Sequence, residues 1–184
     1  MEEYSHPQQI ETLLKKMLSE KPPFVLLHQI RGMIDKEVDS HLQRECQITL
    51  AQFRVLAFLY HSMLHGERVP LSELAEILMV TKANITGLID RLRAQRYVRR
   101  VRDRNDRRRI FVEITPEGST KLEAAILHFE NFMQSLMGSV FTKEERVQFH
   151  RLLKKFNEKL PSVLSEIKNQ LKNLQCQKRV KPCT

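Results

Sequence analysis

The hydrophobic period of this chain changes from 3.6 residues to 2 near position 96, and this change limits the folds open to it. Before the change, apolar residues at helical spacing predict two short helices, at about 72–79 and 81–95, separated by one or two residues. After it, residues 97–102 and 110–114 alternate as strands do, around a polar segment rich in turn formers. The pattern predicts a helix-turn-helix followed by a two-stranded hairpin, or wing.

Longer helices are expected before this unit. One begins near Pro7 and ends before the two prolines at 22 and 23, and a second spans about residues 24–45. A third begins at Thr49, which has capping-box spacing to Gln52.

Helices are also expected after the wing. Thr115 and Pro116 are typical of a helix start, and this helix should run to about residue 140. Thr142 and Glu145 have capping-box spacing again, and the helix that follows is expected to kink or restart at Pro161.

The flanking helices hold more apolar surface than a small winged unit can cover. A homodimer interface is the expected place for this surface; a monomer that packs the helices on its own core is the alternative. The predicted fold is therefore mainly α-helical with a small β-hairpin wing, a winged helix-turn-helix flanked by N- and C-terminal dimerisation helices. The expected parts are an N-terminal extension helix (1–21), a dimerisation helix (22–48), the winged helix-turn-helix (49–118), a long helix with C-terminal dimerisation helices (119–175) and a flexible basic tail (176–184).

The charge of the chain is concentrated in the helix and hairpin. Residues 81–109 contain ten arginines, one lysine and three aspartates, which places +8 of the net charge of +9 in this segment. Guanidinium groups suit phosphate oxygens and guanine edges, and a cluster of one sign indicates a polyanionic partner. The segment therefore predicts binding to nucleic acid.

Composition excludes several other classes of protein. Three cysteines in 184 residues form no disulfide framework and fit a reducing compartment. Neither a signal peptide nor a membrane-spanning run is visible, so we expect a cytoplasmic protein with no membrane partner. No phosphate-binding loop, nucleophile elbow, metalloprotease motif or dinucleotide fingerprint occurs, so we expect neither an enzyme nor a cofactor.

Two runs of residues and a spaced pattern in the wing carry a family resemblance. The runs are Leu-Ser-Glu-Leu-Ala-Glu from position 71 and Thr-Gly-Leu-Ile-Asp-Arg-Leu from position 86; the wing pattern consists of Asp106, Arg108, Ile114, Thr115 and Gly118. Over about residues 50–120 the chain resembles the MarR family of bacterial regulators. The resemblance implies a dimeric winged-helix repressor or activator on a pseudo-palindromic site, with a ligand pocket lined by the helices at 24–46 and 53–65.

The chain departs from the family pattern at two positions. Met79 and Arg96 stand where such proteins usually have glycine, in the helix-helix turn and just after the second helix. If the left-handed backbone is kept, each side chain costs about 1 kcal/mol. The alternative is a different local backbone, which would change the tilt of the second helix.

The first two turns of the second helix are expected to enter the major groove. The residues concerned are Thr81, Lys82, Ala83, Asn84, Thr86 and Gly87. Asn84 suits adenine, and Lys82 suits guanine or phosphate. Thr81 either contacts DNA or only caps the helix, and Gly87 either permits a close approach to the DNA backbone or is chance variation.

The wing is expected to contact the adjacent minor groove. Arg108 is the residue predicted to insert there, and the resemblance implies that Asp106 orients it by an ion pair. The wing residues Arg104, Arg107 and Arg109, together with Ser72 and Arg91, are expected to contact phosphate. The alternatives are that Arg91 forms an ion pair within the protein and that some wing arginines are ordinary exposed charges.

Sensor chemistry is only weakly indicated. His61 and His65 lie four residues apart on one helix and could share a metal ion, but no third ligand is evident, so no metal site is predicted. Cys46 is either a redox switch or an ordinary, partly buried thiol. A small-molecule effector is a further expected partner, of unknown identity. Besides a specific regulator, a nonspecific chromosome-associated protein and a winged-helix protein-interaction module remain open.

Overall fold

The computed structural model describes residues 10, 11, 14, 15, 22–78, 80–103, 106 and 109–179, and for Lys82 and residues 173–179 it describes the backbone only. Most of the expected first helix, together with Met79, Arg104, Arg107, Arg108 and the end of the basic tail, lies outside the described residues. The chain divides into two compact units, residues 1–132 and residues 133–184.

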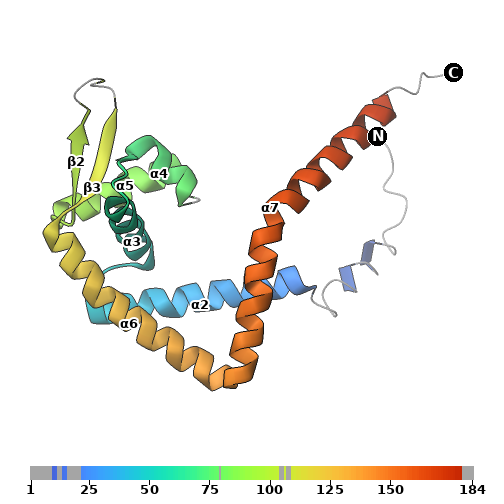
Figure 1. Ribbon diagram of the computed structural model, residues 1–184, viewed down its shortest axis with the longest axis horizontal. Coiled ribbons are helices and arrows are strands. Elements are labelled where there is room, and N and C mark those ends of the chain that lie inside the picture. The colour runs from blue at the N-terminus through green and yellow to red at the C-terminus, as the bar shows by residue number, and fades with distance from the viewer. Residues whose placement is uncertain are drawn as a thin grey trace. The chain divides into compact units, whose positions relative to one another are not determined.

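The helix-turn-helix and the wing are present in the first unit (Figure 1). The elements in chain order are α2 Pro23–Cys46, α3 Leu50–Leu64, β1 Val69–Pro70, α4 Leu71–Ile77, α5 Lys82–Ala94, β2 Val98–Arg102, β3 Ile110–Ile114, α6 Pro116–Val140 and α7 Lys143–Arg179. The predicted mainly α-helical fold with a small wing is confirmed. Of the two alternatives at Pro161, a restart is excluded, because α7 continues through this residue.

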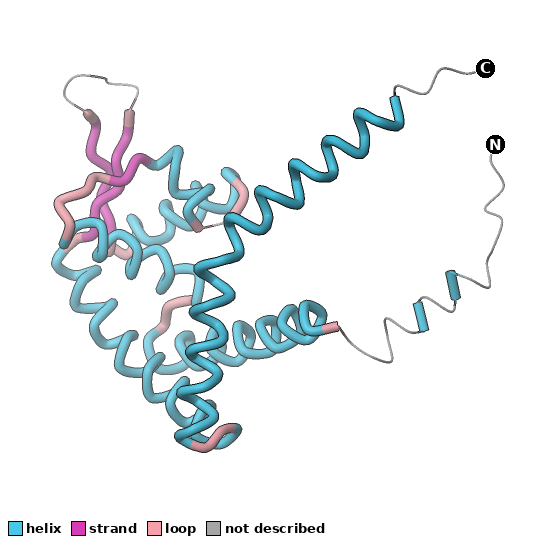
Figure 2. Tube along the Cα trace, turned by 45° about the vertical axis from the view of Figure 1, so that its right-hand side comes forward, coloured by secondary structure: helices cyan, strands magenta, loops and turns pink. Residues whose placement is uncertain are grey.

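The wing contains one strand more than the sequence predicts. Its sheet has three antiparallel strands in the order β1-β3-β2, drawn in magenta in Figure 2. The pairing of Val98 with Ile114 and of Arg102 with Ile110 forms the predicted hairpin, and Val69 pairs with Val112 on the other edge. Because β1 has only two residues, it is too short to show a period of 2 in the sequence.

The core of the first unit explains why α5 exposes its polar side. Ile85, Leu88, Ile89 and Leu92 are buried at helical spacing along α5. They share the core with residues of α3, α4 and the sheet, including Leu56, Leu74, Val98, Val112 and Ile114. With its apolar stripe turned inward, α5 leaves the opposite side to solvent.

Helix starts follow the predicted caps. The Thr49 hydroxyl accepts from the Gln52 amide at 3.1 Å, and the Gln52 side chain accepts from the Thr49 amide at 2.8 Å. Thr142 and Glu145 make the same reciprocal pair at the start of α7, at 3.2 and 2.8 Å. Both capping boxes are therefore confirmed.

Helix α7 forms most of the second unit and exposes a long series of apolar side chains. Its first turn is also held by stacking of Phe141 on Phe149, with ring centroids 5.2 Å apart. The exposed apolar residues beyond it are Val147, Leu152, Leu153, Phe156, Val163, Leu164, Ile167 and Leu171. No helix in the described part of the chain is long and apolar enough to cross a membrane.

A tight junction joins the end of β3 to the turn between α5 and β2. The Thr115 amide donates to the Tyr97 carbonyl at 3.0 Å, and the Thr115 hydroxyl donates to the Arg96 carbonyl at 2.6 Å. The same hydroxyl accepts from the Gly118 amide at 3.0 Å. A Cβ atom on Gly118 would clash with the Tyr97 carbonyl oxygen and lie 2.9 Å from its carbonyl carbon. Glycine is therefore required at position 118 by a close approach of two backbones.

We expect Gly118→Ala to lower the free energy of unfolding by about 2–4 kcal/mol, because the added methyl group must push the junction apart. Gly32→Ala on α2 is the matched control. A Cβ there meets nothing within 4 Å, and alanine favours the helix by about 0.5–1 kcal/mol. Urea unfolding followed by circular dichroism measures both variants, and equal stability of the two would contradict the junction.

Candidate nucleic-acid interface

The first two turns of α5 present small and polar side chains to solvent. Thr81 caps the helix by accepting from the Asn84 amide at 3.3 Å, and it is exposed. Ala83, Asn84 and Thr86 are exposed as well, and Gly87 is half-buried. The expected reading residues whose side chains are described therefore face outward, while Lys82 is described only as the first backbone position of the helix.

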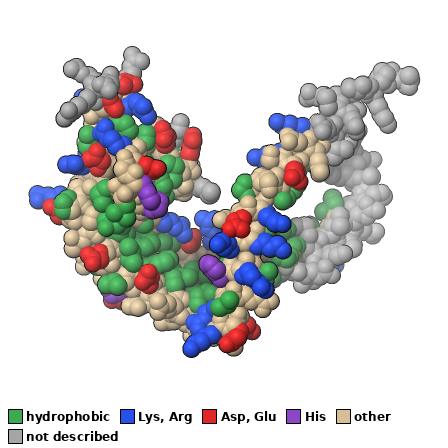
Figure 3. All heavy atoms as spheres, viewed as in Figure 1, with side chains coloured by type: hydrophobic (Ala, Val, Ile, Leu, Met, Phe, Trp, Pro, Cys, Tyr) green, Lys and Arg blue, Asp and Glu red, His purple; other side chains and the backbone are tan. Residues whose placement is uncertain are grey.

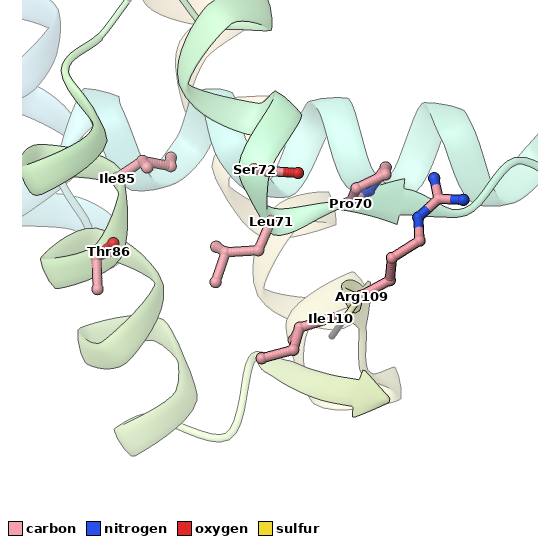
Figure 4. Close-up of a pocket in the computed structure, with 7 residues that line it drawn as sticks. All are labelled: Pro70, Leu71, Ser72, Ile85, Thr86, Arg109 and Ile110. Carbon is pink, nitrogen blue, oxygen red and sulfur yellow. The ribbon is translucent and has the colours of Figure 1, made fainter. Parts of the chain in front are cut away.

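A shallow hollow brings three expected site residues together. It has a volume of about 310 Å³, and its lining includes Ser72 at the start of α4, Thr86 on α5 and Arg109 just before β3 (Figure 4). The apolar lining residues are Pro70, Leu71, Ile85 and Ile110. The hollow thus joins the two helices of the helix-turn-helix to the base of the wing.

Arg91 lies one turn further along α5. Its side chain is exposed, and its Nη1 atom would lie 3.9 Å from a Cβ placed on Gly87. The guanidinium group therefore reaches back over Gly87 towards the first turns of α5. The described ion pairs of Asp90 are with Arg93 and Arg100, so the expected alternative pair between Asp90 and Arg91 is not among them.

Backbone hydrogen bonds close the base of the hairpin tip. The Asp103 amide donates to the Arg109 carbonyl at 3.0 Å, and the Arg109 amide donates to the Asp106 carbonyl at 2.9 Å. The Asp106 amide also donates to the Asp103 carboxylate at 3.1 Å. The contacts expected of Arg104, Arg107 and Arg108 remain predictions, because these residues lie outside the described part of the chain.

Some arginines of the basic segment form ion pairs within the protein. Arg99 donates from Nε and Nη2 to the Glu113 carboxylate, at 3.1 and 2.9 Å. Arg100 lies against Asp90 with Nη2 and Oδ1 2.9 Å apart. Since Asp90 is on α5 and Arg100 on β2, the second pair ties the helix to the wing.

Arg68 is a basic residue beside the wing that sequence reasoning missed. Its guanidinium carbon lies 4.0 Å from the centroid of the Phe111 ring, and Arg109 lies 5.5 Å from the same ring. Arg68 also lies 3.5 Å from Glu113. Arg68 lies outside the basic segment at residues 81–109 and outside the MarR-like sequence pattern. Its position beside the wing is therefore evident only from the pairing of β1 with β3. Figure 3 shows basic side chains at the sheet end of the first unit, beside the hydrophobic side chains of its body.

The described candidate sensor residues, Cys46, His61 and His65, are not arranged as a redox switch or a metal site. Cys46 is buried, and this burial raises the pKa of its thiol, which disfavours the reactive thiolate at neutral pH. The ring centroids of His61, on the last turn of α3, and of His65, its C-cap, lie 4.4 Å apart, and both residues are exposed. Among the described residues, no three His, Cys, Asp or Glu side chains gather in a way that could hold a metal ion.

Arg96 keeps the left-handed backbone that glycine usually provides after the second helix. Its φ is 62°, and its carbonyl accepts the bond from Thr115. The first of the two alternatives for this position is thus the correct one, and the tilt of α5 does not require a different local backbone.

We expect Arg96→Gly to be more stable than Arg96→Ala by about 1 kcal/mol, because both variants remove the same charge but only glycine relieves the left-handed strain. Thermal unfolding of the two variants side by side measures the difference. Equal melting temperatures would show that the backbone at position 96 is not strained.

Comparison with known proteins agrees with this geometry. The MarR family model matches residues 47–109. The chain is 33% identical over 109 residues to the HTH-type transcriptional repressor YetL of Bacillus subtilis, an alignment that covers 59% of this chain and 64% of YetL, just under two thirds of its length. It is 32% identical over 139 residues to the HTH-type transcriptional repressor NicR of Pseudomonas putida, covering 72% of this chain and 85% of NicR.

Two solved structures are similar over nearly their whole length. Wild-type MarR of E. coli in its apo form superposes with a TM-score of 0.65 at 27% identity and covers 73% of this chain and 96% of its own. The S. aureus MepR-DNA complex superposes with a TM-score of 0.60 at 25% identity and covers 77% of this chain and 99% of its own. The chain therefore shares its helices and wing, in the same arrangement, with the MarR and MepR structures.

Proposed function

Since this chain belongs to the MarR family of transcriptional regulators, we propose that it is a DNA-binding repressor that acts as a homodimer on a pseudo-palindromic operator. In this proposal α5 is the recognition helix and enters the major groove, while the wing reaches the flanking minor groove. Half-sites in the two major grooves would lie about one DNA turn apart.

The observation that carries the proposal is the surface formed by α5, the start of α4 and the base of the wing. Asn84 and Thr86 offer hydrogen-bonding groups at the exposed end of α5, and Ser72 and Arg109 border the same hollow with groups that suit phosphate. The neighbouring segment carries an excess of arginine, which attracts a polyanion. The likeness to a MepR-DNA complex supports the same mode of binding.

Exposed apolar side chains support the homodimer. On α2, Phe24 is 64% exposed and Met33 61% exposed, and on α7 Phe156 is 56% exposed. Such side chains, spread along two long helices, are typical of a surface that another subunit covers. A second copy of the chain is the partner proposed for both helices, because a two-fold dimer also matches a pseudo-palindromic site.

The proposal includes the sign of regulation and control by an effector. YetL and NicR are both named repressors, which favours repression here. A small ligand that relieves repression is proposed by analogy with the family.

We expect opposite signatures for a base-reading residue and a phosphate-contacting residue. Asn84→Ala should weaken binding to a duplex selected from random DNA by about 1–3 kcal/mol and leave the dependence of log Kd on log salt unchanged. Arg109→Ala should weaken binding to selected and shuffled duplexes alike and reduce the salt slope by about 0.9. Fluorescence anisotropy over a range of salt concentrations measures both effects.

Lys155→Ala on α7 is the charge control for Arg109→Ala, since it also removes one exposed positive charge but lies outside the proposed DNA interface. It should keep the salt slope of the unchanged protein. Gel filtration should show that this variant keeps the oligomeric state of the unchanged protein. If the protein binds selected and shuffled duplexes equally, it is a nonspecific DNA-binding protein. If it binds no duplex at all, the interface assigned to α5 is wrong.

A further inference from the structure

The C-terminal end of α5 is held by a buried amide from a different helix. Gln52 on α3 is only 5% exposed, and its Nε2 atom donates to the Oε1 atom of Gln95 at 3.0 Å. Gln95 is the C-cap residue of α5. This bond joins the start of α3 to the end of the proposed recognition helix, 43 residues further along the chain.

The direction of the Gln52 side chain is set by the capping box. Its Oε1 atom accepts from the Thr49 amide at 2.8 Å, so the nitrogen of the same group is left to reach Gln95. Because an amide group is planar, fixing its oxygen also fixes where its nitrogen donates. The capping box at the start of α3 therefore directs the hydrogen bond of Gln52 towards Gln95.

The start of α3 is bonded to α2 on its other side. The Leu50 amide donates to the Asp39 carboxylate at 2.6 Å, and Arg54 donates to Asp35 at 2.6 Å. Asp35 and Asp39 are four residues apart and so lie on one face of α2. The first turns of α3 thus stand between α2 and α5 and are hydrogen-bonded to both.

We propose that Gln52 and Gln95 are positioning residues of the DNA interface, whose hydrogen bond fixes the angle of α5 and connects it through α3 to α2. This inference rests on the proposed function of α5. Apolar contacts of Ile85, Ile89 and Leu92 hold the helix against the core but are non-directional. A hydrogen bond at the end of the helix adds the missing directional constraint.

Because Asn84 and Gln95 lie near opposite ends of α5, a small rotation of the helix about Gln95 displaces Asn84. At 1.5 Å per residue, the two positions are about 16 Å apart along the axis, so a tilt of about 4° shifts Asn84 by about 1 Å. Bidentate base contacts do not survive a shift of that size. Phosphate contacts by long arginine side chains tolerate it, so the bond should control specificity more than total affinity.

The test uses Gln95, because changing this exposed residue leaves the capping box intact. The readout is the ratio of the Kd for a shuffled duplex to the Kd for a duplex selected from random DNA, measured on the full chain by anisotropy. Gln95→Ala should lower this ratio at least about fivefold, comparable to the loss of one base contact, while the melting temperature changes by no more than about 2 °C. Gln95→Glu keeps an oxygen that accepts from Gln52 and should keep the ratio within about twofold of the unchanged protein.

A second variant separates the bond from other effects of position 95. Gln52→Met removes the donor of the Gln52–Gln95 hydrogen bond and should by itself lower the ratio of the two Kd values. Adding Gln95→Ala to Gln52→Met should lower that ratio no further, because the hydrogen bond is already absent. The inference is overturned if Gln95→Ala discriminates as well as the unchanged protein, if Gln95→Glu loses as much as Gln95→Ala, or if the two changes add. If the unchanged protein itself does not discriminate between the duplexes, the proposed function fails and the inference fails with it.

Discussion

The contact between the Gly118 segment and the turn after α5 determines how the wing lies against α5. The Thr115 amide donates a hydrogen bond to the Tyr97 carbonyl, and the Thr115 hydroxyl donates one to the Arg96 carbonyl. The absence of a side chain at Gly118 lets the start of α6 approach the Tyr97 carbonyl. Since β2 begins directly after this turn, its position and the pairing of β3 with it follow from the same contact. The hollow between α4, α5 and the wing exists because this junction holds the sheet beside the helix.

The described arginines of residues 81–109 include some that are paired within the protein and some that are exposed. Arg99 and Arg100 are opposed by Glu113 and Asp90, so part of the positive charge stabilises the wing and its link to α5. Arg91 on α5 and Arg109 beside β3 are exposed. Exposed ion pairs contribute little stability individually, and the pair of Arg100 is the more enclosed of the two, with the Arg100 side chain 23% exposed. Net charge therefore overstates the number of arginines available to DNA.

The sequence predicted the helices from α2 onward, the hairpin and the outward face of α5, because these depend on local periodicity and capping residues such as Thr49 and Thr115. It did not predict β1, whose two residues carry no periodic signal, or the role of Arg68, which only strand pairing brings beside Phe111. The bond between Gln52 and Gln95 was equally invisible, since it joins residues 43 positions apart through ordinary polar side chains. At Pro161 the sequence left a kink or a restart open. The helix does not restart there, because a proline removes one helical hydrogen bond but a long helix with bonded turns on both sides can continue through it.

Selection of bound sequences from random duplex DNA by the full chain tests the central claim most directly. Two copies of α5 reading adjacent major grooves should enrich an inverted repeat whose half-sites are centred about 10–11 base pairs apart, with A·T-rich flanks where the wings lie. Enrichment of no sequence, or of a single unrepeated site, would contradict a homodimeric regulator that reads DNA through the surface of α5 and the wing.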